Sequence, residues 1–315
     1  MTTAVTLVAV GFAVFAALRG LGLERGFPLV PLLAYTPYVA GAAVLAVTAA
    51  GLLRRWIPMA VLAVAAAVLV VAVVPRAVPF GITHAGGPAF RVMTLNTLVG
   101  GARTDEIIAL VRDREVDVLA LQEVTPEFVA DLSAAGLDDL LPYTVDRSGP
   151  GVTGGTVHSS MPLTDAGSLE GPHGFAMPVA AFEAPGDEYE RTVEVVSVHT
   201  PPPLDPSHVE LWRTELAALG PPETGPSRIL AGDFNATLDH AALRDVLNAG
   251  YLDAAAVLGE GLTPTWPALG GSLPPVTIDH VLVEPFMGVD DLETVEVTGS
   301  DHRAVLVTVT LPGGR

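Results

Sequence analysis

The first 74 residues of the chain are almost free of charged side chains, and this limits how they can fold. Three apolar stretches occupy this part of the sequence, at Thr3–Leu21, Pro28–Leu53 and Ile57–Val74. Each approaches or exceeds the ~18–20 residues that cross the hydrocarbon core of a bilayer as a helix. A helix also satisfies its own backbone hydrogen bonds, which lipid cannot do. We therefore predict that residues 1–76 form three transmembrane helices.

The alternative is a cleaved signal peptide followed by a buried helical hairpin. A signal peptide normally carries basic residues before its apolar core, but Met1–Leu7 contains neither Lys nor Arg. Two further apolar stretches of membrane-spanning length would also remain unexplained. The sequence therefore favours three membrane helices.

The basic residues beside the predicted helices do not decide which end faces the cytoplasm. Arg54 and Arg55 lie on the side shared with the N-terminus, whereas Arg19, Arg25 and Arg76 lie on the side of the C-terminal part. Cytoplasmic loops carry an excess of Lys and Arg, but two residues against three give no clear excess. We interpret Arg19 as a helix-end residue whose side chain extends to the membrane surface.

From Ala77 onward the chain is strongly acidic, with 11 Arg and 34 Asp plus Glu and a net charge near −23. Because Lys and Arg contacts with phosphates dominate nucleic-acid binding, we expect such a domain to repel nucleic acid. The sequence contains no Cys, which excludes disulfides and thiolate metal sites. It also contains no Lys, which excludes Schiff-base chemistry and a P-loop.

Residues 77–88 contain several Pro and Gly and are predicted to be a linker to one domain, residues 89–315. Strand-like and helix-like patterns alternate in that domain, which predicts an α/β fold of two packed sheets with helices outside them. Helices are expected at Thr104–Arg114, Thr125–Ala134, Pro206–Leu219 and His240–Ala249. Strands are expected at Phe90–Leu95, Val116–Leu121, Gly155–Ser159, Ala176–Glu183, Thr192–His199, Arg228–Ala231, Thr277–Glu284, Val295–Thr298 and Ala304–Leu311.

Polar residues stand repeatedly at the ends of the predicted strands. Because such positions meet at one rim of a sheet, where ligand sites commonly form, we expect these side chains to converge. They are Asn96, Glu123, His199, Asp233, Asn235, Asp279, Asp301 and His302. Each taken alone has a structural explanation, such as a helix cap, a surface charge or an Asx turn; eight together favour a reaction centre.

The chemistry that suits this set is phosphate ester hydrolysis. Carboxylate and amide oxygens such as those of Glu123 and Asn96 are hard ligands for Mg²⁺, which also binds substrate phosphate. A His hydrogen-bonded to an Asp makes an oriented general base. An Asn side chain and a second His can donate hydrogen bonds to the transition state.

The segments NTL, LALQEV, SVHT, AGDFNA, IDHVLV and SDHRAV occur in an order and spacing that resembles the endonuclease/exonuclease/phosphatase superfamily, over Phe90–Leu311. The resemblance implies a four-layer α/β/β/α sandwich and a divalent metal, with Mg²⁺ preferred over Mn²⁺ or Ca²⁺. It implies that Glu123 is the main metal ligand, with Asn96 and Asp301 near the metal. It also implies a catalytic imidazole at His302 held by Asp279, a nucleophile oriented by Asp233, and a phosphate held by Asn235 and His199.

The sequence departs from the family pattern at several positions. Ser160 stands where the family often has Arg and lacks the guanidinium that would make a phosphate or packing contact. Thr97 and Leu98 follow Asn96 without the acidic residue that some nuclease members carry near the metal. His158 and His280 are additional histidines, and His280 is expected to face away from Asp279 because neighbouring residues on a strand alternate.

An acidic domain of this type after three membrane helices resembles the VanJ-type membrane proteins associated with teicoplanin resistance. That resemblance implies a multi-pass protein of the cell membrane that removes the terminal phosphate of undecaprenyl pyrophosphate, or a related polyprenyl pyrophosphate, on the outer face. Three alternatives are a sphingomyelinase-like or phospholipase C-like phosphodiesterase, an exported Mg²⁺-dependent nuclease, and a non-catalytic ligand-binding module. The helices serve either as an anchor alone or, through Tyr35, Thr36 and Tyr38, as a guide for the lipid tail.

Overall fold

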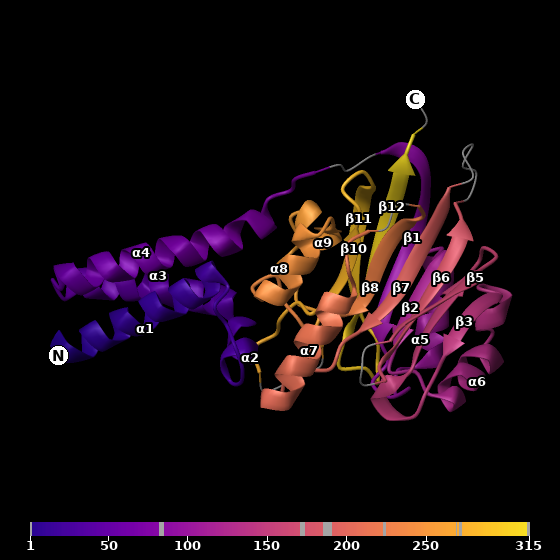
Figure 1. Cartoon of the computed structure of the whole chain (residues 1–315), viewed down its shortest axis with the longest axis horizontal. Helices are drawn as coiled ribbons and strands as arrows, with labels where there is room; N and C mark the ends of the chain where they lie inside the picture. Colours follow the sequence, from indigo (N-terminus) through magenta and orange to yellow (C-terminus); the bar gives the residue numbers. More distant parts are fainter. Residues whose placement is uncertain are drawn as a thin grey trace.

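The C-terminal part of the chain consists of two mixed sheets with helices on their outer faces (Figure 1). The computed structural model describes residues 2–81, 85–170, 174–184, 191–222, 225–268, 270 and 273–313. The first sheet has the strand order β11 (Gly288–Glu296), β12 (Arg303–Pro312), β1 (Gly86–Asn96), β2 (Val118–Gln122), β4 (Gly155–Ser159), β3 (Tyr143–Arg147). The second has the order β5 (Thr164–Glu170), β6 (Ala176–Glu183), β7 (Thr192–His199), β8 (Ser227–Asp233), β10 (Asp279–Val283), β9 (Leu252–Asp253).

The inner faces of the two sheets form the central core. Side chains alternate along each strand, so residues such as Val92 and Val118 of the first sheet meet Val195 and Ile229 of the second. The outer face of the first sheet packs against α5 (Thr104–Asp113) and α6 (Pro126–Ala134), and that of the second against α7 (Pro206–Ala218) and α8 (Ala241–Asn248). The predicted α/β fold of two sheets flanked by helices is confirmed.

Most predicted strands and helices of this domain are present, and the differences lie where apolar periodicity is weak. β1 begins at Gly86, inside the segment predicted to be a linker, and the strand expected at Val295–Thr298 begins earlier, as β11. Strands β3, β5 and β9 were not predicted, because all three lie at sheet edges and each has few apolar residues.

The N-terminal part forms helices α1 (Thr2–Leu21), α2 (Leu29–Leu33), α3 (Thr36–Leu52) and α4 (Trp56–Val73), followed by a 3₁₀ turn at Val74–Ala77. Helices α1, α3 and α4 extend away from the sandwich, whereas α2 lies beside α7 (Figure 1). In the described part of the chain, two helical segments are long and apolar enough to cross a membrane, Thr3–Leu21 and Trp56–Ala77, and α3 is a shorter apolar helix. The prediction of three membrane-spanning helices is therefore supported for two of them.

The second predicted span, Pro28–Leu53, is not one helix, because Pro37 interrupts it. Proline has no N–H, so Pro37 cannot donate the helical hydrogen bond to the carbonyl of Leu33 four residues earlier. The hydroxyl of Thr36 donates to that carbonyl instead, at 2.7 Å. The break leaves α2 free to turn toward the C-terminal domain, where Val30 packs in the core beneath the second sheet.

The three long helices pack through small residues and expose large apolar ones. Ala43 and Ala65 are buried between them, whereas Leu45 is 72% exposed and Ile57 and Leu52 are each 81% exposed. Small residues permit close approach of helix backbones, as in membrane helix pairs. The apolar exterior is compatible with association with a membrane.

Candidate active site

The register of the strands brings the predicted polar residues to one edge of the sandwich. In the second sheet, β7 pairs parallel with β8 and β8 pairs antiparallel with β10, so that both His199 and Asp279 lie opposite Asp233. In the first sheet Asn96 lies opposite Gln122, the residue before Glu123. The polar residues at the strand ends of both sheets therefore lie at the same edge of the sandwich.

Asn96 connects the two sheets at this edge. Its Nδ2 donates to Oε1 of Glu123 and to Oδ2 of Asp233, both at 3.1 Å. Nε2 of His199 lies 3.8 Å from Oε1 of Glu123 and 3.9 Å from Oδ2 of Asp233. The side chain of Asn235 donates to Oδ2 of Asp233 at 3.1 Å, and its backbone N–H donates to Oδ1 at 2.8 Å.

His302 is held by carboxylates on both sides of its ring. Its Nδ1 lies 3.0 Å from both carboxylate oxygens of Asp279, and its Nε2 lies 3.8 Å from Oδ2 of Asp233 and from Oδ1 of Asp301. Burial alone would lower the pKa of His302, but the nearby charges of Asp279, Asp233 and Asp301 outweigh it and raise the pKa to about 10. With Nδ1 directed at Asp279, Nε2 is the atom available to a ligand.

Two of the acidic residues are destabilised as anions. Burial raises the pKa of Glu123, partly opposed by the hydrogen bond from Asn96, and burial raises the pKa of Asp233, partly opposed by the charge of His302. Glu123 and Asn235 also have left-handed backbones, with φ of 56° and 45°. Such strain in residues other than Gly is typical of functional sites, where the surroundings hold the residue in place.

Several supporting residues were not predicted from the sequence. Nε1 of Trp266 donates to Oδ2 of Asp301 at 2.9 Å, and the hydroxyl of Thr265 accepts from the backbone N–H of Asp279 at 3.1 Å. Both residues belong to the stretch TPTWP, whose Pro and Thr content indicates only a loop. No local pattern in the sequence shows which strand such a loop will contact.

The donor set at this edge suits a divalent metal ion. Carboxylate oxygens of Glu123, Asp233, Asp279 and Asp301 converge there, and Oδ1 of Asp301 is buried without a hydrogen-bond partner among the described residues. Ligand atoms of Asp233, Asp279 and His302 lie within 4.8 Å of one another. A buried acidic group of this kind requires compensating positive charge. The ligand set predicted from the sequence, Glu123 with Asn96 and Asp301, borders this group.

The eight predicted site residues form a polar cluster, and six of them, all but Asn96 and Asp279, line a cavity of about 470 Å³ whose lining is mostly apolar. One wall comes from the N-terminal part, through Pro31, Ala34 and Tyr35, and other apolar positions include Phe175 and Leu204. The lining residues in the described part of the chain include His208 and His240 but neither Arg nor Ser160. The phosphate contact that an Arg in place of Ser160 would supply is therefore not expected in this cavity.

The two additional histidines noted in the sequence, His158 and His280, do not line the cavity. His280 bonds through Nδ1 to Asp253 at 3.0 Å and through Nε2 to the carbonyl of Ala236 at 2.9 Å, so it is structural, as expected from strand alternation. His158 lies between the hydroxyls of Thr144 and Thr156, at 3.0 and 2.9 Å.

His158 makes the domain sensitive to acid. Burial lowers the pKa of His158 from 6.5 to about 4, so below pH 6.5 the unfolded chain takes up a proton that the folded chain does not. The contribution to stability is present above pH 6.5 and is lost as the pH falls toward 4. We expect His158→Gln, which keeps a hydrogen-bonding side chain, to reduce the loss of unfolding free energy between pH 7 and 4.5 by on the order of 2 kcal/mol. Chemical denaturation in detergent at the two pH values measures this, and equal losses in both proteins would contradict it.

The comparisons with known proteins agree with this geometry. Residues 93–302 match the model of the Endonuclease/Exonuclease/phosphatase family, whereas no curated protein sequence matches the chain. Among solved structures, a humanized D. rerio TDP2 with 14 mutations has 16% sequence identity and a TM-score of 0.58, and the match covers 70% of this chain and 99% of the other. An endonuclease/exonuclease/phosphatase from Bacteroides vulgatus has 19% identity and a TM-score of 0.52, and the match covers 71% of this chain and 99% of the other. The 3′ phosphatase NExo from Neisseria, bound to a product DNA hairpin, has 18% identity and a TM-score of 0.53 over 69% and 98%. At these identities the structures show a shared fold, and with the family model covering most of the chain, the protein belongs to the Endonuclease/Exonuclease/phosphatase family.

Proposed function

We propose that this protein is a membrane-anchored, metal-dependent phosphohydrolase that removes the terminal phosphate of undecaprenyl pyrophosphate or a related polyprenyl pyrophosphate. One observation carries the proposal: the cavity that holds the polar cluster is mostly apolar, and one of its walls belongs to the segment between apolar helices α1 and α3. A lipid with a phosphorylated head has the two kinds of surface that this cavity offers.

Of the three residues considered as guides for a lipid tail, only Tyr35 lines the cavity. The hydroxyl of Thr36 is used within the helix break, and Tyr38 donates to the carbonyl of Pro275 at 2.7 Å, outside the cavity. We therefore propose Tyr35, with Leu98 and Val276, as the surface for the first part of the tail.

The residues of the cluster suit hydrolysis of a phosphoric anhydride. Glu123, Asp301 and Asn96 would hold the divalent ion on which enzymes of this family depend, with Mg²⁺ preferred, and the bound ion would neutralise charge developing on the phosphoryl oxygens. The carboxylate of Asp233 accepts a proton from the attacking water.

The two histidines and Asn235 act on the phosphate. His302 donates through Nε2 to a phosphoryl oxygen, because Asp279 fixes its ring through Nδ1. Burial lowers the pKa of His199, so this ring is neutral and positions the phosphate by hydrogen bonding. Asn235 lies beside them, and its Nδ2 donates to the carbonyl of Thr200 at 2.8 Å and to Oδ2 of Asp233 at 3.1 Å, so it contacts the phosphate by exchanging one of these two bonds.

We further propose that the chain is a multi-pass protein with its catalytic domain on the outer face and Arg54 and Arg55 in the cytoplasm. The support is the resemblance to VanJ-type proteins together with the apolar exterior of α1, α3 and α4.

A nuclease is the second candidate, because similar structures include one of D. rerio TDP2 with a single-strand DNA product and NExo with a DNA hairpin. The acidic domain and the cavity without Arg among its described lining residues weigh against it. A sphingomyelinase-like or phospholipase C-like activity would use the same residues.

Side-by-side assays of the full chain in detergent micelles with Mg²⁺ test the proposal. We expect release of inorganic phosphate from undecaprenyl pyrophosphate, slower release from farnesyl pyrophosphate, and neither headgroup release from sphingomyelin nor cleavage of plasmid DNA. EDTA or Glu123→Ala should lower phosphate release by about 10³-fold or more, since the metal supplies several kcal/mol of charge stabilisation. Headgroup release or DNA cleavage without phosphate release would replace the proposal by one of its alternatives.

A further inference from the structure

A buried cluster of charged side chains joins the N-terminal helices to the loop after β8, the strand that ends at Asp233. The carboxylate of Asp239 is fully buried and pairs with Arg19 of α1, at 2.9 Å, and with Arg76 after α4, at 2.8 and 2.5 Å. The interpretation of Arg19 as a residue extending to the membrane surface is therefore wrong, since its guanidinium faces the C-terminal domain. The end of α1 and the 3₁₀ turn after α4 thus meet on one carboxylate.

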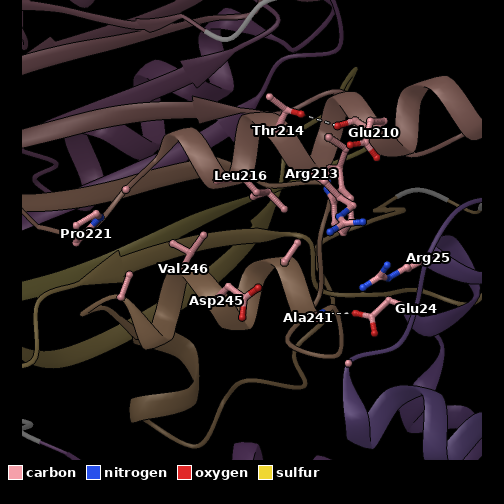
Figure 2. Close-up of a pocket in the computed structure, with 16 residues that line it drawn as sticks. Glu24, Arg25, Glu210, Arg213, Thr214, Leu216, Pro221, Ala241, Asp245 and Val246 are labelled. Carbon is pink, nitrogen blue, oxygen red and sulfur yellow. Dashed lines mark hydrogen bonds between the residues drawn. The ribbon is translucent and has the colours of Figure 1, made fainter.

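Neighbouring contacts strengthen this junction. Arg244 of α8 donates to the backbone carbonyls of Asp239 and of Arg19, and the carboxylate of Glu24 accepts from the backbone N–H of Ala241, the first residue of α8 (Figure 2). A cavity of about 700 Å³ lies beside this contact, lined by Gly22, Glu24 and Arg25 and by residues of α7 and α8 (Figure 2). None of the eight predicted site residues lines that cavity.

The residue next to Asp239 extends the junction to the active-site wall. Nδ1 of His240 accepts from the backbone N–H of Thr237 at 2.9 Å, so the proton of the neutral ring resides on Nε2. Nε2 then donates to the carbonyl of Val30 in α2, at 2.9 Å. Burial lowers the pKa of His240, which keeps the ring neutral. His240 itself lines the active-site cavity beside Pro31 and Tyr35.

We propose that Asp239 is a positioning residue for substrate binding: through Arg19, Arg76 and the adjacent His240 it holds α2 in place as a wall of the active-site cavity. The site for the apolar part of the substrate is then complete only when the N-terminal helices are docked on the domain. The role of this wall in binding a lipid substrate rests on the proposed function, whereas the placement of α2 by Asp239 does not.

Loss of the Asp239 charge should open this junction and spare the fold of the domain. A buried ion pair that loses one partner leaves an uncompensated charge, which is strongly unfavourable. Arg19 and Arg76 lie at the boundary between the helices and the domain, so separation returns both to water. Asn235 and Asp233 keep their own contacts with Thr200 and Asn96, so the chemical step is less affected.

The chain has no Cys, so the single Cys introduced by Tyr35→Cys reports directly on how exposed the α2 wall of the cavity is. We expect Asp239→Asn in that background to increase the rate of labelling by a charged maleimide about tenfold in the detergent-solubilised full chain, as a local opening would. Asp245→Asn, an exposed carboxylate on α8, is the matched control and should leave the rate unchanged. A Cys at Tyr143→Cys, in β3, should label equally in all backgrounds.

Kinetics provide the second measurement. With farnesyl or undecaprenyl pyrophosphate, we expect Asp239→Asn to raise KM about tenfold and to keep kcat within about twofold, because ground-state binding is weakened and the chemical step is unchanged.

Arg76→Lys is the second variant, for use if Asp239→Asn does not fold. It keeps the positive charge but loses the paired contact with Asp239, so it should shift the labelling rate and KM in the same direction. An unchanged labelling rate, or an equal increase with Asp245→Asn, overturns the inference. Absence of any lipid hydrolysis would overturn the proposed function alone, since labelling is decided without a substrate.

Discussion

Replacing His302 by Ala is expected to lower kcat for phosphate release about 10³-fold, within the range that follows the loss of one hydrogen-bond donor to a developing negative charge. The expectation follows from the geometry of the ring. Asp279 occupies Nδ1 at 3.0 Å, and Nε2 faces Asp233 and Asp301, which leaves that atom as the donor to the phosphate. His208 also lines the cavity with its Nδ1 on a carboxylate, that of Asp205 at 2.7 Å, but it is not beside Asp233 or Asp301 among the described ion pairs. Steady-state kinetics at saturating lipid and Mg²⁺ measure the effect.

His158→Gln is the control for this substitution. It also replaces a buried His of the same domain, but one that bonds to Thr144 and Thr156 and does not line the cavity. We expect its kcat at pH 7 to stay within about twofold of the unmodified chain, since only a transition-state contact changes kcat strongly. If His302→Ala and His158→Gln had the same small effect, His302 would not be the catalytic imidazole.

The convergence of the polar residues could be predicted because strand ends are visible in a sequence. Apolar runs such as FRVMTL and VEVVSV place Asn96 and His199 at the ends of β1 and β7, and parallel neighbours end at the same edge. The antiparallel strand β10 needs a different reason: its first residue, Asp279, meets the last residue of β8, Asp233. The apolar pattern of the sequence indicates that Asp233 and Asp279 lie at strand ends. The antiparallel pairing of β8 with β10 shows that these two strand ends lie at the same edge of the sheet.

The connection between the N-terminal helices and the candidate active site could not be predicted in this way. Arg19 and Asp239 are 220 residues apart, and a basic residue at the end of an apolar helix has the same local pattern whether it faces lipid headgroups or a carboxylate. The break at Pro37 likewise gives no direction for α2. Contacts of this kind depend on how two folded parts dock, and neither periodicity nor turn chemistry records that.

The segment around α2, which packs against the C-terminal domain, offers an explanation of how a member of this family can select its substrate. The polar cluster lies at a sheet edge that the fold alone provides, and the shared fold therefore does not select a substrate. Here Pro31, Ala34 and Tyr35 close one side of the cavity with apolar surface that lies outside residues 93–302, the range matched by the family model. Selectivity for a lipid would thus reside in the N-terminal part, and the chemistry in the C-terminal part.

Gly232→Ala is expected to lower the free energy of unfolding of the domain by about 3 kcal/mol or more, combining backbone strain with overpacking. Gly232 immediately precedes Asp233 and has a φ of 157°, and a Cβ there would lie 1.9 Å from the carbonyl oxygen of Val198 on β7. That distance leaves no room for an atom, so β8 would have to move away from β7. Because His199 lies opposite Asp233 across this pair, phosphate release should be lost as well.

Gly225→Ala separates the two causes of this effect. Gly225 has nearly the same φ, 153°, but a Cβ there meets no described atom within 4 Å. It should therefore show the cost of the backbone alone, while Gly232→Ala adds the collision between strands. Thermal unfolding in detergent should place Gly232→Ala about 5–10 °C below Gly225→Ala, at about 2–4 °C per kcal/mol for a domain of this size. Equal melting temperatures would show that β7 and β8 do not approach each other closely at Gly232, and the alignment of His199 with Asp233 would then lose its structural basis.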